Sequence, residues 1–93
     1  MPKNIKYSIL PEHIRAGARR YIEDGTPPGD FLRAAFEDKL VESFKRADET
    51  NLQRMFDVAS FMYNEVPAPC RGSKEKVENW IEMGGLVGMM KGD

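Results

Sequence analysis

The amino-acid sequence predicts an all-α fold, a small bundle of four or five short helices preceded by an extended N-terminal arm. Apolar residues recur at helical spacing in four separate segments, whereas only residues 5–9 alternate apolar and polar side chains as a strand does. The stretch Thr26-Pro27-Pro28-Gly29 separates the first two segments. Proline lacks the amide that a helix interior needs, and glycine adopts backbone angles that other residues avoid, so this stretch marks a boundary between helices.

Length and charge limit the class of protein. The 93 residues suffice for one domain with a modest core, which we place over 1–93 with an arm at 1–9 and a tail at 86–93. The 14 basic and 15 acidic residues give no bulk electrostatic reason to bind nucleic acid or an acidic membrane. No apolar run approaches the ~20 residues of a membrane span. The N-terminus lacks the apolar stretch of a signal peptide, and a single cysteine excludes an internal disulfide framework, so we expect a cytoplasmic protein.

The first helix is predicted over residues 11–24. Pro11 suits the first helical turn, where a missing amide costs nothing. One apolar stripe at helical spacing predicts the buried face, and it consists of Ile14, Ala18, Tyr21 and Ile22. Gly25 follows the last of these residues closely and is expected to end the helix in the left-handed conformation.

The second helical region is predicted from about Pro28 to Ala47. It carries two apolar groups, which are Phe31, Leu32, Ala35 and Phe36, and then Leu40, Val41 and Phe44. Glu37 and Asp38 stand between the groups and are able to cap a new helix, so a kink or break near Asp38 is an alternative to one continuous helix.

A third helix is predicted to begin at Thr50, because Thr50 and Gln53 have the spacing of a capping box. Its stripe is the cleanest helical period in the chain and consists of Leu52, Met55, Phe56, Ala59, Met62 and Tyr63. We expect Phe56, in the middle of this stripe, to be a core residue. The helix should stop near Asn64-Glu65, because Pro67 disfavours helix just before it.

Ser73 is a good N-cap for a last short helix, which carries Val77, Trp80 and Ile81 and closes at Gly84-Gly85. The tail beyond it is apolar but contains two further glycines, so we expect it to be loose or used in contacts. An exposed apolar tail on a short chain predicts a homo-oligomer.

Catalytic and metal-binding groups are scarce. His13 is the only histidine and Cys70 the only cysteine, and the sequence has neither a CxxC nor an HxxxH spacing. A cysteine nucleophile would need His13 beside Cys70 in space, for which the sequence gives no argument. We therefore predict no enzyme, no catalytic residue, no metal and no cofactor.

The sequence contains a characteristic set of short motifs between Leu10 and Gly85. They are Leu10-Pro11-Glu12-His13, Arg20-Tyr21-Ile22-Glu23, Pro27-Pro28-Gly29 with Phe31-Leu32, Arg46-Ala47-Asp48 with Asn51, Phe56-Asp57, Tyr63-Asn64, Pro67 with Cys70, Gly72-Ser73, and Trp80-Ile81-Glu82. Together they resemble a family of small bacteriophage and prophage accessory proteins that are usually called hypothetical.

The resemblance implies a phage accessory protein that acts in the cytoplasm of the infected bacterial host, and it carries over no catalytic residue. Short phage genes of this kind often encode counter-defence factors, which either inhibit host defence proteins or sequester host immune signalling nucleotides. This implication comes from the genomic setting and not from the residues. The alternative is a small regulatory or DNA-associated protein, although the near-neutral charge and the lack of a concentrated basic helix count against it.

A nucleotide-binding site would draw on residues at helix ends or beside glycine and proline. The candidates are Arg20, Tyr21, Arg46, Asn64, Arg71 and Ser73. Arginine grips phosphate with two parallel hydrogen bonds, tyrosine stacks on a base, asparagine reads a base edge, and a helix start accepts anions. Tyr63-Asn64 beside Arg71-Gly72-Ser73 would line a polar pocket. The competing interpretation makes the same residues ordinary caps and surface ion pairs.

Overall fold

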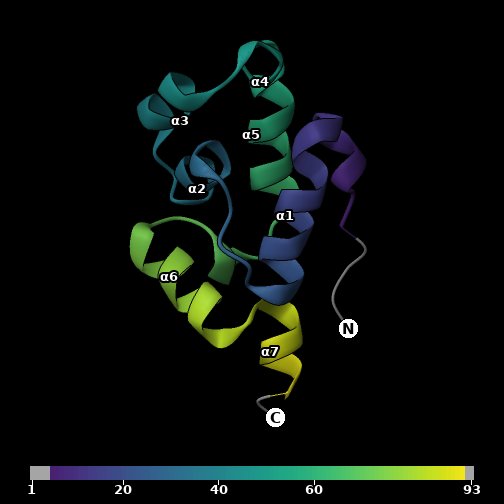
Figure 1. The fold of residues 1–93 in the computed structure, drawn as a ribbon, viewed down its shortest axis with the longest axis vertical. Helices are drawn as coiled ribbons and strands as arrows, with labels where there is room; N and C mark the ends of the chain where they lie inside the picture. The colour runs from purple at the N-terminus through teal and green to yellow at the C-terminus, as the bar shows by residue number, and fades with distance from the viewer. Residues whose placement is uncertain (1–4, 92–93) are drawn as a thin grey trace.

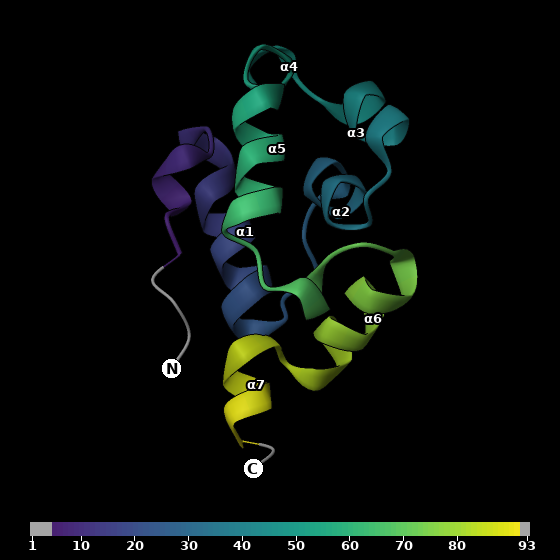
Figure 2. The same cartoon turned by 180° about the vertical axis from the view of Figure 1, so that it is seen from behind.

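The computed structural model describes residues 5–91, and this part of the chain is helical, without a β-strand (Figures 1 and 2). The α-helices are α1 (Glu12–Asp24), α2 (Asp30–Phe36), α3 (Leu40–Arg46), α4 (Glu49–Gln53), α5 (Met55–Asn64), α6 (Lys74–Met83) and α7 (Gly85–Lys91), and the 3-10 turns are η1 (Tyr7–Ile9) and η2 (Ala68–Cys70). The predicted all-α fold is therefore confirmed. Its helices outnumber the expected four or five, because two predicted helices are broken and the tail is helical.

Helix α1 forms as predicted. Pro11 directly precedes it, and its stripe of Ile14, Ala18, Tyr21 and Ile22 is buried. Gly25 ends the helix at φ 74°, and its amide donates to the Tyr21 carbonyl at 2.9 Å. A positive φ is inexpensive only for glycine, which explains the residue at this position.

The predicted second helix is two helices, α2 and α3, with the break at Asp38, whose φ is 63°. The acidic pair does not cap α3, since Lys39 occupies the N-cap position without a capping side-chain bond. The two halves also differ in burial. Phe31, Leu32 and Phe36 are buried, whereas Leu40, Val41 and Phe44 of α3 are exposed.

The capping box predicted at Thr50 and Gln53 is wrong. Asp48 is the N-cap of α4, and its carboxylate accepts a hydrogen bond from the Asn51 amide at 2.8 Å. Asp48 has the extended backbone and the short acceptor that a cap requires, two residues earlier than expected. Arg54 then separates α4 from α5.

The stripe predicted as the core face of the third helix is only partly correct. Helix α5 buries Val58, Phe61 and Met62, whereas Phe56 is 84% exposed and Tyr63 is 79% exposed. The helix is apolar on two sides, so its periodicity does not reveal which side packs inward. The expectation that Phe56 is a core residue is therefore wrong.

The core joins segments that are far apart in sequence. The Trp80 indole N–H donates to the carbonyls of Tyr21 and Ile22, both at 3.1 Å. The Tyr21 hydroxyl donates to the Cys70 carbonyl at 2.6 Å, and the centroids of the Tyr21 and Phe36 rings lie 4.3 Å apart. These contacts tie the end of α1 to α2, η2 and α6.

The C-terminal prediction holds for α6, and of the two alternatives for the tail, loose or used in contacts, the second holds for residues 85–91. Ser73 caps α6, since its hydroxyl accepts from the Lys76 amide at 3.1 Å, and Gly84 ends the helix at φ 91°. The tail is not loose: residues 85–91 form α7, which packs against α1 (Figure 1). Gly25 and Gly85 allow this approach, because a Cβ at Gly85 would lie 2.5 Å from the Gly25 nitrogen.

The described part of the N-terminal arm is not extended. Residues 7–9 form the turn η1, and Ile5, Tyr7 and Ile9 pack against the core. The Tyr7 hydroxyl donates to Glu23 at 3.1 Å. The arm prediction for residues 1–4 and the tail prediction for residues 92–93 lie outside the described residues.

Two phenylalanines on α5 test the position of the core. Phe61→Ala is expected to lower the free energy of unfolding by about 3–5 kcal/mol, because it removes a fully buried ring. Phe56→Ala in dilute protein should change it by less than about 0.5 kcal/mol. Urea unfolding followed by circular dichroism measures both. Equal losses would mean that the orientation of α5 is wrong.

Gly85 tests the contact between α1 and α7. Gly85→Ala is expected to cost at least about 2 kcal/mol of folding stability, because the methyl group meets backbone atoms and φ is 68°. Gly29→Ala is the control, since a Cβ there has no neighbour within 4 Å, and it should cost no more than about 1 kcal/mol. Similar melting temperatures for the two variants would contradict the close packing.

Candidate functional site

A groove of about 220 Å³ lies between α3 and α5, and we call it the α3–α5 groove. Most of its lining is apolar and comprises Ala35, Leu40, Met55, Val58, Ala59 and Met62. Its polar lining comprises Asp38, Lys39, Ser43, Tyr63 and Arg71. An apolar groove with a few convergent polar groups is the usual form of a ligand site.

Tyr63 and Arg71 form a stacked pair at this groove. The guanidinium carbon of Arg71 lies 5.8 Å from the centroid of the Tyr63 ring, within the range of a cation–π contact. The Arg71 Nε is buried and finds no hydrogen-bond partner among the described residues. A buried donor without an acceptor costs free energy, so this Nε is an unsatisfied polar atom at the groove.

The backbone on both sides of Arg71 is held in place. The Cys70 carbonyl accepts the Tyr21 hydroxyl, and the Gly72 amide donates to the Phe36 carbonyl at 2.9 Å. Arg71 thus stands between two hydrogen bonds to the core. Its backbone does not have to be ordered when a ligand binds, which lowers the entropic cost of binding.

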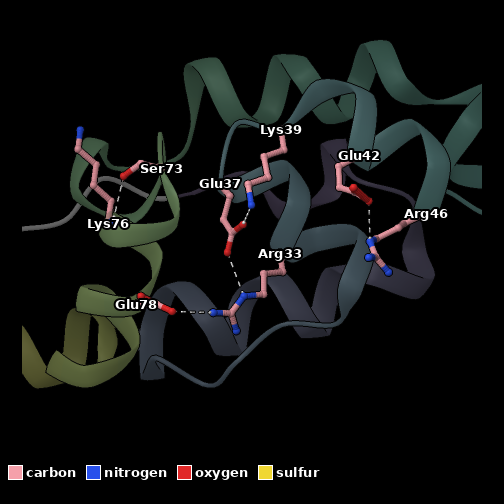
Figure 3. Close-up of polar contacts among 8 residues, drawn as sticks. All are labelled: Arg33, Glu37, Lys39, Glu42, Arg46, Ser73, Lys76 and Glu78. Atoms are coloured by element: carbon pink, nitrogen blue, oxygen red, sulfur yellow. Dashed lines mark hydrogen bonds and ion pairs between the residues drawn. The ribbon is translucent and has the colours of Figure 1, made fainter.

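A second hollow, of about 210 Å³, lies between α2 and α3 and is polar. Figure 3 shows Glu37 between Lys39 and Arg33, with which it forms ion pairs of 3.0 Å each. Arg33 also approaches Glu78 at 3.7 Å. Burial raises the pKa of Glu37, but the hydrogen bonds from Lys39 and Arg33 outweigh burial and hold the pKa below its ordinary value.

Arg46 borders this polar hollow and does not reach the α3–α5 groove. It pairs with Glu42 at 3.2 Å and with Asp30 at 3.3 Å. Its charge is therefore neutralised within the chain, as the ion-pair interpretation of the sequence expected.

Of the six predicted site residues, the α3–α5 groove contains only Arg71. Tyr21 is fully buried, and its hydroxyl donates to the Cys70 carbonyl. The prediction that its ring stacks on a ligand is therefore wrong, and Tyr21 is a core residue. Arg20 is exposed on α1 and lines neither hollow. The six residues do not converge within one chain.

Asn64 and Ser73 have local roles. The Asn64 amide donates to the Ser60 hydroxyl at 3.2 Å, and both residues lie on α5. The Ser73 hydroxyl already accepts from the Lys76 amide, as Figure 3 shows. The first turn of α6 thus has its own cap.

Four polar residues of the groove are absent from the predicted set, which are Asp38, Lys39, Ser43 and Tyr63. Tyr63 was assigned to the buried stripe of the third helix, although its position beside Asn64 and near Arg71 also predicted a pocket. Lys39 gave no signal in the sequence, because only the break at Asp38 brings it to the groove.

His13 and Cys70 have separate partners. His13 lies 2.8 Å from Asp48, whereas the Cys70 thiol donates to the Pro67 carbonyl at 3.0 Å. Cys70 is fully buried, and burial raises the pKa of its thiol to about 12. A buried thiol of this kind is a poor nucleophile. Within residues 5–91 no group of three or more His, Cys, Asp or Glu residues is placed to hold a metal ion.

Comparison of the chain with protein-family models, with curated proteins and with solved structures finds no match. The family resemblance therefore remains an expectation from the sequence. In the described part of the chain, every helix is too short or too polar to cross a membrane.

The Glu37 ion pairs predict a dependence of stability on pH. Because the pKa of Glu37 is lowered on folding, its contribution is complete above the ordinary pKa of glutamate and is lost as the pH falls through the lowered value. Glu37→Gln should cost roughly 1–3 kcal/mol at pH 7 and reduce the loss of stability between neutral and acidic pH. Urea midpoints measured from pH 7 to acidic pH check this, and parallel curves would contradict it.

Proposed function

We propose that this chain is a non-catalytic bacteriophage accessory protein with a counter-defence role, which sequesters an anionic signalling nucleotide of the host. The observation that carries the proposal is the exposed Tyr63 ring stacked against Arg71 beside an apolar groove. The phage setting and the cytoplasm of the infected host come from the resemblance of the sequence strings.

The chemistry of the α3–α5 groove suits a nucleotide. A base has a flat apolar face, which can pack on Tyr63 and on the methionine and alanine side chains of α5. A phosphate needs charged donors, which Arg71 supplies as a planar fork and Lys39 as a single charge. Lys39 is also paired with Glu37, so Arg71 is the stronger anion donor of the two.

Sequestration requires no reaction. A protein that only binds a signalling nucleotide lowers its free concentration, and it needs affinity and abundance but no nucleophile or general base. The groove offers stacking, apolar contact and a cation, which are binding groups. The proposed function therefore needs only the groups that line the groove.

A second candidate is inhibition of a host defence protein by direct binding. It is favoured by the exposed apolar side chains of α3, α4 and α5, which are Leu40, Val41, Phe44, Leu52, Phe56 and Tyr63. Exposed apolar surface commonly marks a protein interface.

Titration calorimetry with cyclic dinucleotides, cyclic trinucleotides and adenosine-diphosphate-ribose tests the first proposal. We expect at least one of these to bind, and Arg71→Gln to weaken it by about tenfold or more, because a charge-assisted hydrogen bond to phosphate is lost. Arg20→Gln is the matched control, since Arg20 is exposed on α1 and away from the groove, and it should bind like the wild type.

Two outcomes would contradict the assignment. Equal affinity of Arg71→Gln and the wild type would show that the nucleotide binds elsewhere. If no nucleotide in the panel binds, sequestration is wrong and binding to a host defence protein becomes the leading proposal.

A further inference from the structure

Helix α5 has an apolar outer side as well as a buried one. Phe56, Ala59 and Tyr63 are exposed and follow one another at intervals of three and four residues, and we call them the outer seam. These intervals keep the three side chains on one side of the helix. The polar side chains of α5 are limited to Asp57, Ser60 and Asn64, apart from the Tyr63 hydroxyl. A helix that is apolar on most of its circumference is normally covered on both sides.

The exposed apolar area is large for so small a chain. Leu52 of α4 and Leu40, Val41 and Phe44 of α3 are exposed as well, and Leu40 borders the α3–α5 groove together with Ala59 and Tyr63. Together these side chains expose on the order of 700 Å², whereas the largest apolar patch of a typical monomer is about 300–600 Å². A standard protein interface buries about 800 Å² on each partner, so this face alone approaches the area that a stable dimer needs.

We propose that a second copy of this chain covers this face, with the outer seams of the two copies packed antiparallel about a two-fold axis. A two-fold interface requires one patch that is complementary to itself. With the axis midway between Phe56 and Ala59, Phe56 lies over Ala59 of the partner subunit. This pairing sets a large side chain against a small one on both sides of the axis, so the two helices fit closely.

The axis position follows from the order of side-chain sizes. Phe56 and Ala59 are neighbours in the outer seam, one large and one small. A parallel pairing in register would set the two Phe56 rings against each other and leave a void between the two Ala59 methyl groups. The antiparallel pairing avoids both faults, because each ring fills the space above an alanine.

This surface differs from the association surface that the sequence predicted. The tail forms α7, and Leu86 is buried against the rest of the chain, so much of its apolar surface is already used. Association through the outer seam goes beyond the proposed function and does not depend on it. Because α3 and α5 both line the α3–α5 groove, a second copy would also shield a ligand there from water.

An exchange of side-chain sizes tests the register. Sedimentation velocity should show that the wild type forms a dimer. Phe56→Ala and Ala59→Phe should each raise the dissociation constant of the dimer by about tenfold or more. The double variant F56A/A59F is expected to recover association to within about threefold of the wild type, since it restores a phenylalanine over an alanine on both sides of the axis. Circular dichroism confirms that each variant is folded.

Met90→Ala is the control, because Met90 is exposed on α7 and outside the outer seam, and it should associate like the wild type. A monomeric wild type at high concentration would overturn the proposal, and so would single variants that associate normally or a double variant no better than either. Arg71→Gln should associate like the wild type, so failure of this proposal and failure of nucleotide binding are separate results.

Discussion

The indole N–H of Trp80 holds together the end of α1 and the C-terminal half of the chain. It donates to the carbonyls of Tyr21 and Ile22, which belong to the last turn of α1. The Tyr21 carbonyl also accepts the Gly25 amide, and helix-end carbonyls that are buried without a partner cost free energy. The buried indole therefore adds a hydrogen-bond partner at the end of α1 and fixes α6 against it. Phenylalanine has a similar apolar surface but no such donor.

The candidate site depends on this core. The Tyr21 ring packs on Phe36, and its hydroxyl binds the Cys70 carbonyl. The Phe36 carbonyl in turn accepts the Gly72 amide. Residues 70 and 72 are thus attached to α1 and α2, and Arg71 between them is directed to the groove beside Tyr63. Tyr21 was predicted as a ligand contact, and its actual role is to position the loop that carries the cation.

Several arginines of the molecule are paired with carboxylates within the chain. Arg33, Arg46 and Arg54 all pair with carboxylates. Arg71 instead faces an aromatic ring and has a buried Nε without an acceptor. Near-neutral composition predicts no broad basic surface, and Arg71 is the arginine that lines the apolar groove in the described part of the chain.

The sequence by itself determined the all-α fold, the span of α1, the Gly25 and Gly84 ends and the Ser73 cap, and it offered the break near Asp38 as an alternative. These features depend on neighbouring residues, through backbone angles, missing amides and short side-chain acceptors. Tertiary structure decided which apolar side of α5 is buried, whether the tail forms a helix, and which polar residues meet. Phe56 and Phe61 are equally apolar, and only the neighbours of α5 in space bury one and expose the other. Arg71 likewise reaches Tyr63 because distant backbone groups hold its loop, a constraint that no local pattern encodes.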